Sequence, residues 1–273
     1  MKGVGLTLDR PRIMGIVNVT PDSFADGGRY WNPAAAIEHG RLLVEEGADL
    51  IDVGGESTRP GADPISAAEE LRRVMPVVEG LAAAGILISI DTSKASVAMG
   101  ALGAGAAVVN DVTALGDPEM AAVVREHEAG LVLMHMQGNP RTMQTAPMYE
   151  DVVGEVSQFL VERAAVAEAA GIGRQNIAID PGIGFGKTVD HNLVLIRDLD
   201  VLADLGYPLL VGTSRKSFLG KVTGGAADDR DLASAVSVAL AIERGADILR
   251  VHNVVACKEA ALLTLAIVRG SGR

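Results

Sequence analysis

Aromatic residues make up only 3% of the chain, so few rings are available to stack against the bases of a nucleic acid. Basic residues are also scarce: 24 Lys and Arg face 35 Asp and Glu, which gives a formal net charge of −11. A field of that sign disfavours nonspecific binding to nucleic acids and to anionic membrane surfaces. We therefore expect neither a nucleic acid nor a membrane among the partners of this protein.

Cysteine and long apolar runs are nearly absent as well. The single cysteine, Cys257, excludes a disulfide within the chain, which is weakly typical of a reducing compartment. No apolar run approaches the roughly 18 residues of a membrane span. The first residues, MKGVGLTLDRPR, also lack the hydrophobic segment of a signal peptide. The sequence therefore predicts a cytoplasmic protein, with Cys257 buried as packing.

A repeated pattern of helix and strand fills the chain. Segments with helical periodicity end in a glycine, which suits the left-handed position that closes a helix. Each is followed by a short, almost continuously apolar run, as in a parallel sheet covered on both faces. With one more run at the start there are eight, at 13–17, 49–53, 87–91, 107–111, 131–135, 176–180, 209–213 and 247–251, and the glycines are Gly47, Gly85, Gly103, Gly130, Gly171, Gly206 and Gly245.

Helix starts are marked by polar caps, namely Asn32 before Pro33, a Ser66–Glu69 capping box and Asp117 before Pro118. Eight βα units in 273 residues predict an α/β fold, an eight-stranded parallel (β/α)8 TIM barrel forming one domain over residues 1–273. The alternative is a doubly wound open sheet. The barrel is favoured because no glycine-rich dinucleotide fingerprint follows any of these runs.

Polar residues end most of the apolar runs. In a barrel these positions surround the active site. Carboxylates and an amide after the third, fourth and sixth runs complement a flat heterocycle with N–H donors, and cations after the seventh and eighth occupy the usual phosphate position. Taken singly, each residue could be a turn cap or a solvated charge, so only their joint occurrence is informative. The ring comprises Asn18, Asp52, Asp91, Asn110, His135, Asp180, Thr213, Ser214, Arg250 and His252, with Arg215 and Lys216 beside it.

Seven motifs occur in order along the chain: MGIVNVTPDSFADGG, DVGGESTRPGA, SIDTSK, VVNDV, DPGIGFGKT, VGTSRKSFLG and RVHNV. With these motifs the chain resembles the dihydropteroate synthase family of pterin-binding enzymes over essentially its whole length. The resemblance implies condensation of p-aminobenzoate with 6-hydroxymethyl-7,8-dihydropterin diphosphate, which gives 7,8-dihydropteroate and diphosphate. It also implies Mg²⁺ as cofactor and a homodimer as the assembly.

The resemblance further implies a role for individual residues. The pterin-binding set is Asp91, Asn110, Asp180 and Lys216, of which Lys216, Asp91 and Asp180 are the catalytic residues. The diphosphate-binding set is Asn18, Arg59, Arg250 and His252, and Asn18 also binds the metal. The aminobenzoate-binding set is Thr58, Pro60, Phe24, Phe185 and Ser217. The family commonly has an aromatic residue in place of Ile183, so the resemblance leaves one wall contact of the site unassigned.

The polar loop at residues 18–28 is longer than a connection requires, and we expect it to close over the mouth as a lid. Two other functions stay open: methyl transfer from methyltetrahydrofolate to a corrinoid protein, and a non-catalytic paralogue that only binds pterins. The intact SRKS and RVH segments at 214–217 and 250–252 argue against both.

Overall fold

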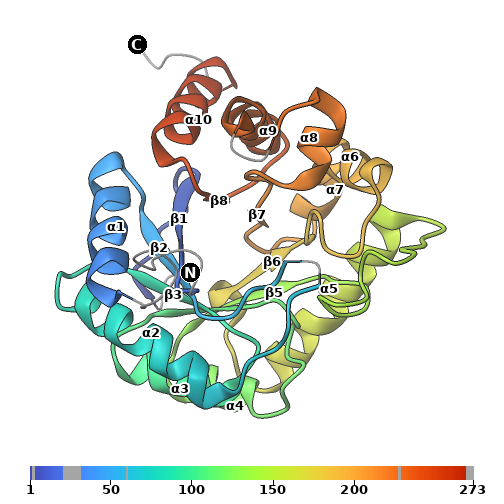
Figure 1. Ribbon diagram of the computed structural model, residues 1–273. Coiled ribbons are helices and arrows are strands. Elements are labelled where there is room, and N and C mark those ends of the chain that lie inside the picture. The colour runs from blue at the N-terminus through green and yellow to red at the C-terminus, as the bar shows by residue number, and fades with distance from the viewer. Residues whose placement is uncertain (2–3, 21–31, 60, 227–228, 269–273) are drawn as a thin grey trace.

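The computed structural model describes residues 1, 4–20, 32–59, 61–226 and 229–268. Parallel strands line a central barrel and helices surround it (Figure 1). The eight strands coincide with the eight apolar runs, because alternating faces of each strand are buried inside the barrel and under the helices. They are β1 (Arg12–Asn18), β2 (Leu50–Gly54), β3 (Ile88–Asp91), β4 (Val108–Asp111), β5 (Gly130–Met134), β6 (Ile177–Asp180), β7 (Leu210–Val211) and β8 (Ile248–Val251).

Strand order decides between the barrel and the open sheet. The hydrogen-bonded order is β6-β5-β4-β3-β2-β1-β8-β7, so sequential strands are neighbours except where β1 meets β8. The remaining gap is closed by a bridge between Ile179 and Leu209, and the Ile179 amide donates to the Pro208 carbonyl at 2.8 Å. Because β7 has only two residues, the closure is short. The predicted barrel is confirmed, and the doubly wound sheet is excluded.

Helices connect successive strands on the outside. Two connections contain a pair of helices, one between β6 and β7 and one between β7 and β8. Among the described residues no helix is long and apolar enough to cross a membrane. The helices are α1 (Pro33–Glu46), α2 (Ala67–Ala82), α3 (Ala95–Gly103), α4 (Met120–Glu126), α5 (Val152–Ala169), α6 (Val189–Arg197), α7 (Leu199–Ala203), α8 (Ser217–Thr223), α9 (Asp231–Glu243) and α10 (Val254–Val268), and a 3-10 turn, η3 (Arg174–Asn176), precedes β6.

The predicted caps form in part. Asn32 accepts from the Ala35 amide and Ser66 from the Glu69 amide, as expected. The Glu69 carboxylate binds Arg72 and Arg73, so only the serine half of the capping box is formed. Asp117 is not the cap of α4, which begins at Met120 after Glu119. Its Oδ1 accepts from the Glu119 amide in the turn before α4, and its Oδ2 accepts from the Ala95 amide at the start of α3.

Two of the seven glycines do not close a helix. The turn after α3 passes through Gly105, with φ 111°, and the turn after α4 passes through Glu128, with φ 52°. Gly103 is still helical, and Gly130 is the first residue of β5. A Cβ at Gly130 would lie 2.4 Å from the Cε of Met1. This glycine therefore makes room for the N-terminal segment.

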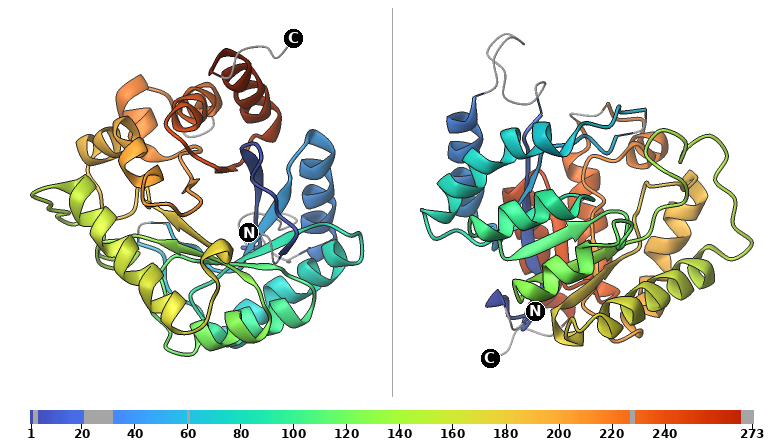
Figure 2. Two further views of the ribbon diagram at one scale, coloured as in Figure 1. Left: turned by 180° about the vertical axis from the view of Figure 1, so that it is seen from behind. Right: turned by 90° about the horizontal axis from the view of Figure 1, so that it is seen from below.

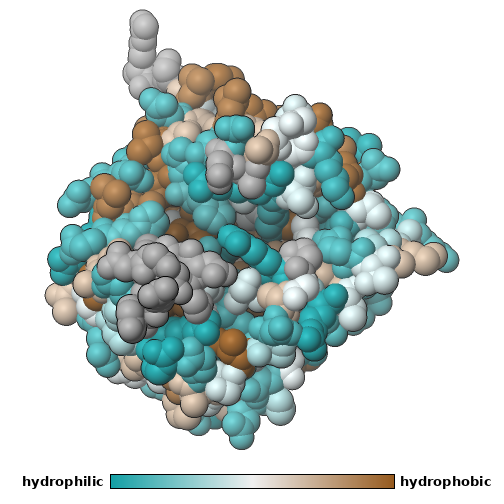
Figure 3. Space-filling view, viewed as in Figure 1, coloured by the Kyte–Doolittle hydropathy of each residue, from teal (hydrophilic) through white to brown (hydrophobic). Residues whose placement is uncertain are grey.

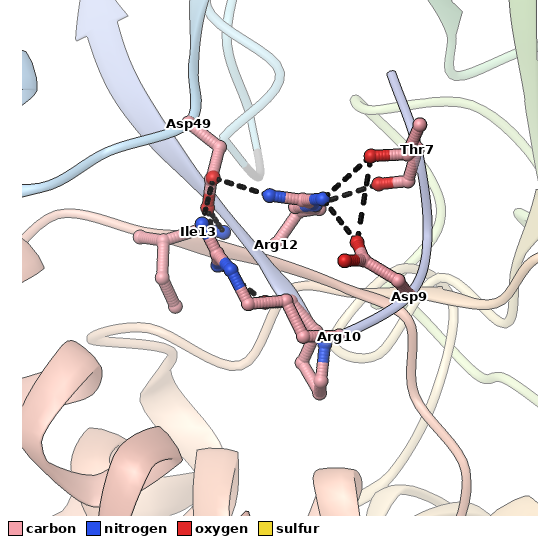
Figure 4. A network of polar contacts seen from close by, with 7 residues as sticks. Thr7, Asp9, Arg10, Arg12, Ile13 and Asp49 are labelled. Carbon is pink, nitrogen blue, oxygen red and sulfur yellow. Dashed lines mark hydrogen bonds and ion pairs between the residues drawn. The ribbon is translucent and has the colours of Figure 1, made fainter. Parts of the chain in front are cut away.

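The N-terminal segment closes the amino end of the barrel. It lies across the strand starts when the molecule is seen from behind (Figure 2). Asp49, just before β2, accepts from Arg10, Arg12 and the Ile13 amide and holds this segment against β1 (Figure 4). The interior residues packed there are Met1, Leu6, Met14, Leu50, Val108, Val132, Ala178, Leu210 and Ile248.

Leu6 tests the importance of this closure. Its side chain is 4% exposed, so Leu6→Ala leaves a cavity under the barrel. We expect a loss of about 2 to 5 kcal/mol in the free energy of unfolding, measured by urea denaturation. Leu42→Ala is the control, since Leu42 is 48% exposed on α1. Equal losses in the two variants would contradict the role of the N-terminal segment.

Candidate functional site

A buried network joins four strands at the carboxyl end of the barrel. Arg250 Nε donates to Asp52 Oδ2 at 2.6 Å, and Arg250 Nη2 donates to Asp91 Oδ2 at 2.7 Å. Asn110 Nδ2 donates to the same Asp52 oxygen at 3.1 Å. Asp52, to which the sequence assigned no role, is therefore shared by two predicted binding residues. Its side chain is fully buried.

Burial changes the protonation of this network. It raises the pKa of Asp91 to about 7, although the Arg250 guanidinium opposes the shift. It also raises the pKa of Asp180, whose Oδ1 accepts from the Gly182 amide at 2.7 Å. Among the described residues, Asp52 Oδ1 and Asn110 Oδ1 are buried acceptors without a hydrogen-bond partner. Such atoms are costly unless a bound ligand supplies donors.

Lys216 reaches the same region from the loop after β7. Its Nζ donates to the Ile183 carbonyl and lies 4.6 Å from the centre of the Phe185 ring. Burial lowers the pKa of Lys216 to about 8, while Asp180 opposes the shift. The Ile183 side chain is fully buried in the core, so this position contributes its carbonyl oxygen to the network. The structure thus brings Lys216 of the predicted pterin-binding set next to Phe185 of the predicted aminobenzoate-binding set.

The loop after β6 is locked onto the end of β5. Its glycines, Gly182, Gly184 and Gly186, all have positive φ. A Cβ at Gly182 would lie 1.9 Å from the His135 carbonyl oxygen, so an alanine there must displace backbone. Beneath the loop, Lys187 is 2% exposed and its Nζ lies 2.9 Å from His135 Nδ1 and 3.0 Å from the Phe185 carbonyl. The motif therefore fixes Phe185.

The arginine side chains near the ends of β7 and β8 form hydrogen bonds with carboxylates of the protein, which the sequence did not indicate. Arg215 forms two hydrogen bonds with Asp231, at 2.7 and 2.9 Å, and Arg250 lies in the network above. His252 Nδ1 lies 3.0 Å from Ser214 Oγ. Burial, together with the charges of Arg250, Arg215 and Arg59, lowers the pKa of His252 to about 3. His252 is therefore neutral at neutral pH, and the guanidinium groups supply the positive field.

The other predicted residues surround the mouth. Asn18 ends β1 and is half-buried, Thr58 is half-buried and Arg59 exposed in the loop after β2, and Ser217 is exposed at the start of α8. Phe24, Pro60 and most of the predicted lid lie outside the described residues.

The sequence analysis did not identify an ion-pair cluster formed by Lys94, Glu56 and Glu70. No local signal could have identified it, because Glu56, Lys94 and Glu70 come from two separate loops and a helix.

Gly182 tests whether the loop after β6 must stay in place. Gly182→Ala adds a backbone clash to the strain of a positive φ, whereas Gly85→Ala adds the strain alone, since nothing lies within 4 Å of its Cβ. We expect Gly85→Ala to lose about 1 to 2 kcal/mol in the free energy of unfolding. Gly182→Ala should lose about 1 to 3 kcal/mol more. Urea denaturation measures both; equal losses would mean that the loop adapts freely.

Comparison with known proteins agrees with this geometry. The family model described as pterin binding enzyme matches residues 14–252. A dihydropteroate synthase of Neisseria meningitidis serogroup C is 49% identical over 258 residues, which cover 93% of this chain and 91% of that protein.

Solved structures agree as well. A Xanthomonas albilineans dihydropteroate synthase with 4-aminobenzoic acid has a TM-score of 0.91 at 50% identity, covering 96% of this chain and 94% of that chain. Another from Xanthomonas albilineans, in complex with 7,8-dihydropteroate, has a TM-score of 0.87 at 46% identity, covering 96% and 95%. The chain therefore belongs to the dihydropteroate synthase family of pterin-binding enzymes.

Proposed function

We propose that this chain condenses 6-hydroxymethyl-7,8-dihydropterin diphosphate with p-aminobenzoate to 7,8-dihydropteroate and diphosphate. The observation that carries the proposal is the buried acceptor set of Asp91, Asn110 and Asp180 beside Lys216. A flat heterocycle with N–H donors satisfies these acceptors, and the relatives that hold 4-aminobenzoic acid and 7,8-dihydropteroate supply the chemical precedent.

The pterin ring binds deepest in the barrel. The carboxylates of Asp91 and Asp180 accept from ring N–H groups, and the free oxygen of Asn110 adds a further acceptor. The ammonium of Lys216 donates to the oxygen and nitrogen edge of the ring. Because these groups are buried, each hydrogen bond to a charged partner contributes about 1.5 to 3 kcal/mol.

The diphosphate lies toward Asn18, Arg59, Arg250 and His252. Positive charge and donors there stabilise the negative charge that develops on the leaving group, at about 3 kcal/mol for each well-placed donor. Neutral His252 contributes as a hydrogen-bonding group rather than as a cation. Arg250 also donates to Asp52 and Asp91, so it links the ring site with the diphosphate site.

Magnesium is part of the same proposal. Among the described residues no group of three or more His, Cys, Asp or Glu could hold a metal ion. Mg²⁺ in phosphate sites keeps several waters and needs one or two protein ligands besides the phosphates, so the amide oxygen of Asn18 fits as the protein ligand. When bound, the ion would neutralise charge on the diphosphate.

The amine of p-aminobenzoate is a weak nucleophile, which favours departure of diphosphate before attack. The electron-rich pterin stabilises the methylene cation, the amine nitrogen forms the new C–N bond, and the resulting ammonium loses a proton. Thr58, Phe185 and Ser217, with Phe24 and Pro60, form the aminobenzoate site. Keeping water out matters here, because water would otherwise capture the methylene group.

Diphosphate release tests the proposal. The purified protein is incubated with the pterin diphosphate and Mg²⁺, with and without p-aminobenzoate, and both diphosphate and dihydropteroate are measured. We expect both products only when p-aminobenzoate is present. A non-catalytic pterin-binding protein gives neither product, and methyl transfer from methyltetrahydrofolate to a corrinoid protein would indicate the other alternative.

The lowered pKa of Lys216 predicts that activity falls at alkaline pH. Its ammonium is the binding form, and burial lowers its pKa to about 8, so kcat/KM for the pterin substrate should fall as pH rises through about 8. In Lys216→Arg the side chain stays protonated, so this fall should disappear from the residual activity. Lys221→Arg, an exposed lysine on α8, is the control. An unchanged fall in Lys216→Arg would assign it to another group.

We also propose that the protein forms a homodimer and acts in the cytoplasm. The cytoplasmic location rests on the sequence alone. Support for the dimer comes from α9 and α10, which expose large apolar side chains; Figure 3 shows apolar surface over α10. Leu232, Leu263 and Ile267 are 78%, 64% and 72% exposed. Exposed large apolar side chains gathered on two adjacent helices are typical of an interaction site.

Sedimentation equilibrium tests this surface. We expect a dimer for the unaltered protein and a monomer for Leu263→Glu, because a charge buried without a partner opposes association. Val161→Glu is the control, since Val161 is 42% exposed on α5, away from this face. If Leu263→Glu leaves the mass unchanged, the dimer does not form through α10.

A further inference from the structure

The loop after β2, residues 55–66, is pinned at both ends by one side chain. Glu56 Oε1 accepts from the Ile65 amide at 2.8 Å, which ties the start of the loop to its end. Its other oxygen accepts from Lys94 Nζ at 2.6 Å. We call Glu56, Ile65 and Lys94 the neck of the loop. Thr58 and Arg59 lie beyond this neck, toward the tip.

The neck is anchored to the neighbouring elements. Lys94, in the loop after β3, also donates to Glu70 Oε2 at 2.6 Å, and the Glu70 side chain is fully buried on α2. Burial alone would lower the pKa of Lys94, yet Glu56 and Glu70 raise it above its ordinary value, so the ammonium stays charged. Arg73 donates to the Gly55 carbonyl at 3.0 Å. Charged contacts on two elements therefore hold the start of the loop.

The tip is held differently. It reaches across the barrel mouth toward the loop after β5, beside β5 and β6 in Figure 1, where the Gly61 amide donates to the Pro140 carbonyl at 3.1 Å. Asp63 and Arg141 form an ion pair there, but their side chains are 79% and 62% exposed. Exposed pairs of this kind contribute little. The direction of the loop is therefore set at the neck.

We propose that Glu56, held by Lys94, is a positioning residue that aims Thr58 at the aminobenzoate end of the site and Arg59 at the diphosphate end. The inference rests on the proposed function, because it names the substrate whose binding depends on this loop. A small rotation at the neck is amplified at the tip, and a misplacement of about 1 Å can cost up to about 100-fold in rate. The pterin slot lies on β3, β4 and β6 and does not depend on this contact.

Glu56→Gln tests the proposal with little change in volume. Its amide oxygen can still accept from the Ile65 amide, but the amide NH₂ cannot pair with Lys94, which stays bound to Glu70. We expect KM for p-aminobenzoate to rise about tenfold. The affinity for 6-hydroxymethylpterin, which lacks the diphosphate that Arg59 faces, should change less than about twofold in calorimetry. Hydrogen exchange at the Ile65 amide should become faster, which reports the loosened neck without any assay of activity.

Two further variants separate positioning from plain stability. Glu79→Gln removes an exposed charge at the other end of α2 and should leave both the KM for p-aminobenzoate and the affinity for 6-hydroxymethylpterin unchanged. Lys94→Arg keeps a cation between the two glutamates and should stay close to the unaltered enzyme. An unchanged KM for p-aminobenzoate in Glu56→Gln, or an equal loss of affinity for 6-hydroxymethylpterin, would overturn the proposal. Absence of dihydropteroate formation by the unaltered protein would instead contradict the proposed function.

Discussion

The guanidinium of Arg250 lies between the carboxylates of Asp52 and Asp91 inside the barrel, and the functional end of the molecule depends on this arrangement. Without the cation, two buried carboxylates would face each other in a region of low polarity. Removing one partner of such a buried pair costs about 3 to 5 kcal/mol, because an uncompensated charge is left behind. The contact also connects β8 to β2 and β3, and Asn110 extends it to β4. One polar network thus holds the strand ends and forms the floor of the site.

The loops that carry the remaining residues are each supported by an ionisable side chain. Lys187 supports the loop after β6 from below, and Glu56 with Lys94 supports the loop after β2. Asp231 on α9 holds Arg215 in the loop after β7. Binding residues on loops are precise only when a supporting shell fixes them. The barrel therefore gives each of these loops a rigid attachment point.

Several sequence-based expectations were correct because they depend on local chemistry. Apolar runs predicted all eight strands, and the polar residues that end them gather at one mouth, since parallel strands share a carboxyl end. Where the expectations were wrong, a distant segment determined the outcome. The helix expected directly after Asp117 begins only at Met120, while Asp117 Oδ2 binds the Ala95 amide at the start of α3, and Gly130 makes room for Met1 instead of closing α4. Neither partner lies within reach of a local pattern.

The sequence by itself determined the βα order, the ring of polar residues and the family. Apolar periodicity and seven ordered motifs are properties of neighbouring residues, and they do not require knowledge of contacts between distant segments. Only the tertiary structure decided the charge states and the supports. His252 is neutral because burial, together with the guanidinium groups of Arg250, Arg215 and Arg59, lowers its pKa. Asp52 is shared because Arg250 and Asn110 converge on it across 198 and 58 residues. Electrostatic interactions depend on distance and burial, and these exist only once the barrel has closed.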